Sequence, residues 1–177
     1  IIKICYRGTL KFGPSNQGAV MSEIRNRTIQ GLQVGDTFTI SRCFTEEDMM
    51  AFADVTRDYN AVHFNSRFSK AKNFKDRICH GLLVGSMLTE IGGQIGWLAS
   101  VMNFRFKQPV YFGETITCRF TITDIDGHLR ASAEAVYFNQ DGNLDLEAEL
   151  KGILPDAVER RILDDMVAGG DPTNKLE

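Results

Sequence analysis

A carboxylate and an imidazole lie five residues apart in a polar stretch of the sequence. Asp58 and His63 belong to residues 56–65, which connect two predicted helices. Side chains of these two types exchange protons near neutral pH, and together they can bind a water molecule and move protons in both directions. The spacing indicates acid–base catalysis. The competing interpretation is an ordinary turn, because Asp and Asn are common turn formers.

The start of the next predicted helix favours the catalytic interpretation. His80 and Gly81 open this helix directly after Cys79. The first N–H groups of a helix have no partner within the helix, and such donors stabilise an oxygen that gains negative charge. Cys79 itself is expected to pack as a small apolar side chain rather than to act as a nucleophile.

Two predicted helices position these groups. The first covers residues 46–55, where Thr45 caps the start and Asp48 follows three residues later. The second covers residues 80–97 and is apolar almost all round, so we expect it to be buried. Its glycines fall on one stripe, which predicts the close approach of a curved sheet or of a second copy of the helix. These glycines are Gly81, Gly85, Gly92 and Gly96.

Alternation of apolar and polar residues predicts an antiparallel sheet. The pairs Asp126-Gly127 and Asp141-Gly142 separate three alternating runs, and they predict tight hairpins in which Gly takes a positive φ. One long buried helix wrapped by such a sheet is the arrangement called a hot dog, so the expected class is α+β with a single hot-dog domain. The expected strands cover residues 37–44, 104–110, 114–125, 129–137 and 144–150.

Both ends of the chain are expected to lie outside this domain. Residues 1–20 contain no acid and no continuous apolar core, and we expect an upstream or cloning-derived extension ahead of Met21. A transit peptide is the weaker alternative, because Arg and Ser are sparse in this stretch. The domain is assigned to residues 21–154. Residues 155–177 are expected to form an amphipathic helix and a tail, with Pro155 near the start and Gly169-Gly170 at the end. Val158, Ile162 and Met166 share one face of that helix.

Charge and composition exclude several classes of function. Lys and Arg number 20 against 23 Asp and Glu, which gives a net charge of -3 and no overall attraction for a nucleic acid. The apolar run that extends from Gly81 up to Glu90, like every other uncharged run in the sequence, is too short to span a membrane. The four cysteines form no Cys-x-x-Cys pair, and the three histidines show no ligand spacing. We therefore expect a cytoplasmic protein without a metal site, a nucleic-acid partner or a membrane partner.

Several linked motifs resemble the MaoC-like dehydratases and R-specific enoyl-CoA hydratases. The pattern Asp58-x-Asn60-x-x-His63 is followed by His80-Gly81 and by Ser86, and the resemblance covers about residues 30–154. Ala61 stands where the family usually has Pro, which frees the local backbone. Further matching pieces, in family order, are Phe44-Thr45, Phe52-Ala53, Phe104-x-Phe106-x-x-Pro109-Val110 and Gly113-Glu114.

The resemblance implies a hot-dog homodimer, or a dimer of dimers, that adds water reversibly to a trans-2-enoyl thioester and gives the (R)-3-hydroxyacyl product. It implies that Asp58 and His63 hold the water, with His63 as the base and Asp58 as the proton donor to the α-carbon, or with these roles exchanged. Ser86 matches a residue that orients the acid. We expect the N–H of Gly81 to stabilise the thioester oxygen while C3 is attacked.

Basic residues between the polar stretch and the buried helix are expected to bind the carrier of the substrate. Coenzyme A brings phosphates and acyl carrier protein brings an acidic surface, and either suits this cluster, while the competing interpretation is a solvated loop. Asn60 and His80 complete the expected substrate-binding set, and His80 is expected to fix the turn into the helix. No separate cofactor is expected, because coenzyme A or phosphopantetheine arrives with the substrate. The basic residues are Arg67, Lys70, Lys72, Lys75 and Arg77.

Two other functions remain open at this stage. A hot-dog thioesterase uses a carboxylate to direct water to the carbonyl carbon, and the presence of Asp58 and His63 in one segment argues against it. A non-catalytic subunit would keep the fold and bind thioesters while a partner carries the reaction. The intact set of Asp58, Asn60 and His63 argues against that function.

Overall fold

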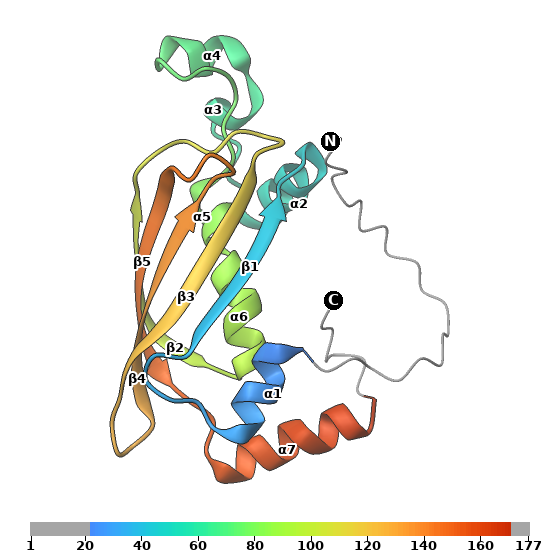
Figure 1. The fold of residues 1–177 in the computed structure, drawn as a ribbon. Coiled ribbons are helices and arrows are strands. Elements are labelled where there is room, and N and C mark those ends of the chain that lie inside the picture. Colours follow the sequence, from blue (N-terminus) through green and yellow to red (C-terminus); the bar gives the residue numbers. More distant parts are fainter. Residues whose placement is uncertain (1–21, 171–177) are drawn as a thin grey trace.

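Five strands form one antiparallel sheet in the computed structural model, which describes residues 22–170 (Figure 1). The order across the sheet is β1-β3-β4-β5-β2. The strands are β1 (Thr37–Cys43), β2 (Leu98–Phe106), β3 (Thr115–Ile125), β4 (Arg130–Phe138) and β5 (Leu144–Ile153). The helices are α1 (Glu23–Gln30), α2 (Glu46–Thr56), α3 (Ala61–Phe64), α4 (Ser66–Ala71), α5 (Gly81–Gly85), α6 (Met87–Ile95) and α7 (Ala157–Ala168). The predicted extension over residues 1–20 and residues 171–177 of the predicted tail lie outside the described residues.

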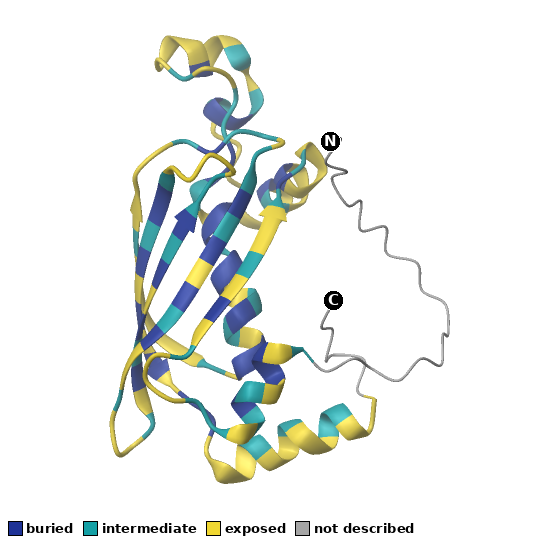
Figure 2. Cartoon of the chain, in the orientation of Figure 1, coloured by how far each residue is buried: buried dark blue, intermediate teal, exposed yellow. Residues whose placement is uncertain are grey.

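The predicted α+β arrangement of an antiparallel sheet around a buried helix is confirmed. Inward residues of β3, such as Ile116, Phe120 and Ile122, are buried, and the strands show the alternating bands of burial in Figure 2. Residues of α6 such as Met87 and Ile91 fill the other side of the core. Burial of these side chains is the main source of stability for such a layer. No described helix combines the length and the apolar character that crossing a membrane requires.

The sequence predicted one continuous buried helix over residues 80–97. The structure instead has two helices, α5 and α6, that meet at Ser86. The hydroxyl of Ser86 donates to the carbonyl of Leu83 at 2.6 Å, and the N–H of Thr89 donates to the carbonyl of Ser86 at 2.8 Å. Bonds of this kind compete with the regular helical pattern and tighten the chain locally. The second helix ends where Gly96 takes a φ of 75°, so Trp97 lies beyond it.

Two of the four predicted stripe glycines bring α5 against β2. A Cβ atom on Gly81 would lie 2.7 Å from the Phe106 ring, and one on Gly85 would lie 3.1 Å from the Phe104 ring. Gly96 instead serves the end of α6. Of the two predicted neighbours of the glycine stripe, the sheet is the one that the chain supplies, through its edge strand β2. The stripe is shorter than predicted, because only Gly81 and Gly85 face this strand.

The two Asp-Gly hairpins differ from each other. Gly142 takes a φ of 81° between β4 and β5, as predicted. Between β3 and β4 the positive φ of 60° falls on Leu129 instead of Gly127. The Asp126 side chain accepts from the N–H groups of His128 and Arg130, at 2.8 and 2.9 Å, and these bonds hold the longer turn.

The other helices meet the expectations unequally. Thr45 and Asp48 form the predicted capping box of α2, and α7 occupies the predicted C-terminal position. The apolar face of α7 is not buried, because Val158 and Ile162 are exposed in the described part of the chain. The sequence analysis did not identify α1, which packs against α6 and α7 at the end of the sheet opposite α3 and α4 (Figure 1).

Substitution of Gly152 tests the packing of β5 against the end of the buried helices. A methyl group on Gly152 would overlap the indole nitrogen of Trp97 and the carbonyl oxygen of Leu98. Gly152→Ala is expected to lower the free energy of unfolding by about 1 to 3 kcal/mol, measured by urea unfolding. Gly127→Ala is the control, because a methyl group there meets no atom of residues 22–170 within 4 Å. Equal unfolding midpoints for both variants would contradict this packing.

Candidate active site

The segment that carries Asp58 is held by its own side chains and contains a short helix. Arg57 ends α2 in the left-handed conformation, with a φ of 59°. The Asp58 carboxylate then accepts from the N–H of Asn60 at 3.2 Å, and the Asn60 side chain accepts from the N–H of Val62 at 3.2 Å. Asn60 thereby caps α3, which carries His63. The predicted polar connection is thus a defined turn and helix, in which Asn60 has a structural contact.

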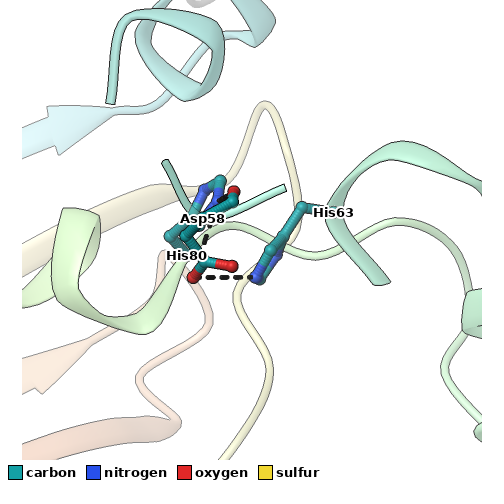
Figure 3. Close-up of side chains that lie close together, drawn as sticks. All are labelled: Asp58, His63 and His80. Atoms are coloured by element: carbon teal, nitrogen blue, oxygen red, sulfur yellow. Dashed lines mark hydrogen bonds and ion pairs between the residues drawn. The ribbon is translucent and has the colours of Figure 1, made fainter. Parts of the chain in front are cut away.

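His63 is buried, and one hydrogen bond sets the direction of its ring. Its Nδ1 lies 2.8 Å from the carbonyl oxygen of Ile78. A carbonyl oxygen only accepts, so Nδ1 carries the hydrogen, and Nε2 of the neutral ring is left with a lone pair. That Nε2 lies 4.0 Å from Oδ2 of Asp58 (Figure 3). The distance exceeds a direct hydrogen bond, and a water molecule that contacts both groups fits this separation.

His80 joins the Asp58 segment to the start of α5. Its Nε2 donates to the carbonyl oxygen of Asp58 at 2.9 Å and lies 3.9 Å from the carboxylate of the same residue. The rings of His63 and His80 stack with their centres 3.7 Å apart (Figure 3). The expected hydrogen-bonding role of His80 at this turn therefore takes the form of a bond to a backbone carbonyl.

The surroundings of His63 favour its neutral form. Burial lowers the pKa of the His63 imidazole, because a charged ring loses its hydration there, and His80 lowers it further. The hydrogen bond to Ile78 and the charge of Asp58 act in the opposite direction. The balance is a pKa below the ordinary value, so the ring is available as a base at neutral pH.

Asp58 and His63 lie on a cavity of about 680 Å³. Its wall also contains His80 and Gly81, so four of the predicted site residues meet in one place. Gly81 is the first residue of α5, and no side chain caps this helix start in the described structure. Most of the remaining wall is apolar, with Phe52, Phe74, Ile78, Leu82, Val84, Phe106, Pro109, Val110 and Leu146.

The structure does not bring Ser86 to this group. Its hydroxyl donates to Leu83, and the residue lines a separate hollow with Arg42 and Glu90. An action of Ser86 on the Asp58 carboxylate, as the resemblance implied, is not supported by this placement.

The basic residues also lie away from the cavity wall. Lys70, Lys72 and Lys75 are exposed in and after α4. Arg77 forms an ion pair with Glu46 and lies over the ring of Phe112. The cluster is therefore a surface beside the site, and its part in binding a carrier stays a prediction.

Three groups of metal-ligand type meet at the site. One ligand atom from each of Asp58, His63 and His80 lies within 4.8 Å of the others, an arrangement that could hold a metal ion. The hydrogen bond from Nε2 of His80 to the Asp58 carbonyl competes with ligation through that nitrogen. The expected absence of a metal stays a prediction.

Cys79 is a poor nucleophile in this environment. It is buried, and burial raises the pKa of its thiol to about 12. The thiol is therefore protonated at neutral pH, when the thiolate would be the reactive form. This agrees with the expectation that Cys79 packs as an apolar side chain.

Asp145 lies on the cavity wall, although the sequence pattern did not indicate it as a site residue. Strict alternation along β5 predicts that Asp145 points away from the core, between Leu144 and Leu146. In the structure Tyr137 pairs with Leu146 and Phe138 pairs with Leu144, so Asp145 is the extra residue of a β-bulge. A bulge of this kind redirects a side chain, and Asp145 is buried together with Leu146. A one-residue insertion in the pairing leaves no mark in the pattern of residue types.

The carboxyl of Asp145 has no polar partner among the described residues. Its side chain is 1% exposed, and neither carboxylate oxygen has a hydrogen-bond partner. Burial raises the pKa of Asp145 to about 6, and the charge of Glu114 adds to the rise. A buried acid with a raised pKa therefore lies on the same cavity as Asp58 and His63.

The titration of Asp145 predicts a pH dependence of stability. The folded state binds the proton more tightly than the unfolded state, in which the pKa is near 3.8. The free energy of unfolding therefore falls as the pH rises from about 4 to above 6. Asp145→Asn removes this loss, and we expect it to be more stable than the unchanged protein at pH 8 by at least about 1 kcal/mol and nearly equal at pH 4.

Thermal unfolding at several pH values measures this difference. Asp124→Asn is the control, because Asp124 is an exposed carboxylate on β3. The same pH dependence in Asp145→Asn and in the unchanged protein would contradict the burial of this carboxyl.

Proteins with similar sequences are named as dehydratases or hydratases of acyl thioesters. The chain is 34% identical over 97 residues to a mitochondrial 3-hydroxyacyl-[acyl-carrier-protein] dehydratase of Arabidopsis thaliana, covering 54% of this chain and 57% of that protein. It is 28% identical over 131 residues to an (R)-specific enoyl-CoA hydratase of Aeromonas caviae, covering 71% of this chain and 98% of that protein. The chain thus spans little more than half the length of the Arabidopsis relative.

Solved structures show the same relationship. The (R)-hydratase from A. caviae superposes with a TM-score of 0.67 at 28% identity, covering 71% of this chain and 99% of that one. An R-hydratase from Pseudomonas aeruginosa superposes with a TM-score of 0.66 at 25% identity, covering 72% of this chain and 85% of that one. Residues 27–140 match the family described as the MaoC like domain. That match takes in α3, α5, α6 and the Asp58–His63 pair, and we conclude that the chain belongs to the MaoC-like family.

Proposed function

We propose that the protein is a hydro-lyase that adds water reversibly to a trans-2-enoyl thioester and forms the (R)-3-hydroxyacyl thioester. The observation that carries the proposal is the separation of 4.0 Å between the Asp58 carboxylate and the free Nε2 of His63 on an apolar cavity. The names of the related hydratases and dehydratases support the same reaction class.

The two side chains provide the proton transfers that hydration needs. In that direction the water oxygen forms a bond to C3, a water O–H bond breaks, and a C–H bond forms at the α-carbon. Nε2 of His63 can accept the proton from water, because Nδ1 is held by Ile78. We assign to Asp58 the delivery of a proton to the α-carbon, and the proton that His63 gains from water returns to Asp58 before the next cycle. Dehydration uses the same groups in reverse.

The start of α5 suits the charge that develops on the substrate. While C3 is attacked, the thioester carbonyl oxygen gains negative charge, and an N–H aimed at it lowers the barrier. Gly81 begins α5 on the cavity wall, and we assign this role to its N–H. The apolar wall limits the access of bulk water and strengthens such a bond.

The carrier of the acyl group is expected to dock beside the cavity. Lys70, Lys72 and Lys75 provide exposed positive charge on and after α4 for the phosphates of coenzyme A or for an acidic carrier protein. Coenzyme A or phosphopantetheine belongs to the substrate, so the proposal includes no separate cofactor. The cytoplasmic location stays a prediction, because two relatives are mitochondrial by name.

The working form is proposed to be a homodimer, with a dimer of dimers as the larger assembly. β2 lies at an edge of the sheet and carries exposed apolar side chains, among them Leu98, Val101, Met102 and Phe106. An exposed edge of this kind invites pairing with a second strand. Sedimentation equilibrium is expected to give at least twice the mass of the chain, and a monomer at working concentrations would contradict the proposal.

Incubation with crotonyl-CoA tests the reaction directly. Loss of absorbance from the conjugated thioester, without release of free thiol, is expected for hydration. Release of thiol would instead identify a thioesterase. No change with either short or long enoyl chains would favour a non-catalytic thioester-binding subunit.

Substitution of the catalytic pair tests the assignment of residues. Asp58→Asn and His63→Ala are each expected to lower turnover at least about 100-fold, because each removes a proton-transfer group. The matched controls are Asp124→Asn and His128→Ala, which change an exposed carboxylate and an exposed imidazole outside the cavity. Circular dichroism should show an unchanged fold. Near-normal turnover in either active-site variant would refute the assigned site.

A further inference from the structure

The wall of the catalytic cavity contains a carboxyl group that the reaction described above does not use. The β-bulge turns Asp145 inward, where it lines the same cavity as Asp58 and His63. Its neighbours on that wall include Phe106, Val110 and Leu146, which offer no hydrogen bonds. A buried carboxyl among such side chains is costly to maintain unless something pairs with it.

The other described residues leave this carboxyl unpaired. The backbone carbonyl of Asp145 accepts from the N–H groups of Lys107 and Gln108, at 2.8 and 3.2 Å, so the main chain of the residue is anchored. The side-chain oxygens have no partner in the described structure. The neighbouring ammonium group of Lys107 pairs with Glu147 at 2.8 Å. The charge that acts on Asp145 most directly is that of Glu114, which is also negative.

An enoyl thioester can supply the missing donor. The pantetheine arm carries amide N–H groups and a hydroxyl, and an acyl chain can carry a hydroxyl or an amine of its own. Resting on the function proposed above, we propose that Asp145 is a specificity-determining residue that accepts a hydrogen bond from an O–H or N–H group of the bound thioester. This deepens the proposed function by naming a polar feature of the substrate.

The placement has a consequence for selectivity. A site built to hydrogen-bond a substrate rejects an analogue that lacks the donor, because the buried group of the protein is left unpaired in the complex. Asp145 therefore disfavours a purely apolar group at its end of the cavity. The wall is selective there by polarity, in addition to its size and shape.

Two variants and two substrates test the proposal. Asp145→Leu keeps the branching at Cγ and the number of side-chain heavy atoms and removes every acceptor, whereas Asp145→Asn keeps an acceptor oxygen in nearly the same place. The substrates are trans-5-hydroxypent-2-enoyl-CoA and trans-hex-2-enoyl-CoA, in which a methyl group replaces the terminal hydroxyl. We measure kcat/KM for hydration, and calorimetry gives the binding affinity of the same thioesters without any need for turnover.

Each outcome has a defined meaning. A loss of about 10-fold or more in Asp145→Leu for the hydroxylated substrate only would assign the donor to the acyl chain. An equal loss of that size for both substrates would assign it to the carrier arm. In either case Asp145→Asn is expected to stay within about threefold of the unchanged protein.

Other results would overturn the proposal. One is that Asp145→Leu keeps kcat/KM and affinity within about twofold of the unchanged protein with both substrates. The other is that Asp145→Asn lowers kcat/KM as much as Asp145→Leu does. If the unchanged protein hydrates crotonyl-CoA, the proposed function holds, and such a result would overturn only the role of Asp145. A protein that binds these thioesters but hydrates none would contradict the function, while the affinities would still decide the role of Asp145.

Discussion

The close approach of α5 to β2 is the constraint on which the site depends. Gly81 and Gly85 have no side chains to separate the helix from the rings of Phe106 and Phe104, so the start of the helix lies directly against the edge of the sheet. The hydroxyl of Tyr137 donates to the carbonyl of Gly85 at 3.0 Å and ties the helix to β4 from the core side. These contacts bring the first N–H groups of α5 to the cavity. His80 then binds the Asp58 segment to the same point.

The site separates its two carboxyl groups by environment. The Asp58 side chain is 48% exposed, whereas Asp145 is 1% exposed, although both border one cavity. Placing similar groups in different surroundings is how proteins give them different tasks. His63 is buried like Asp145, but unlike Asp145 it has a polar partner, the backbone carbonyl of Ile78, which fixes its tautomer. In the proposed reaction Asp58 and His63 carry the proton transfers, and Asp145 takes no part in them.

Much of the fold and the central pair could be predicted from the sequence, because their signals are local. The alternation of residue types within β3 is enough to predict a strand. The Thr45–Asp48 capping box likewise predicts the start of α2 from a few residues. Asp58 and His63 are close in the chain, so a short capped turn suffices to bring them together. The placement of Ser86 away from this pair could not be predicted, because its hydroxyl donates to the nearby carbonyl of Leu83, which no spacing rule reveals. Leu129 took the left-handed position because the Asp126 carboxylate fixed a longer turn.

The β-bulge in β5 carries a wider meaning for how this cavity could change. Successive residues of a strand face opposite sides of the sheet, so one extra residue in the pairing decides which side chains face the cavity. The polarity of this part of the wall therefore depends on the number of residues in the strand as well as on their types. Pairing without this extra residue would turn the carboxyl to the other face of the sheet and leave Leu146 on the cavity. A change in the length of this hairpin could therefore exchange a polar lining for an apolar one, without any substitution among the other residues of the cavity wall.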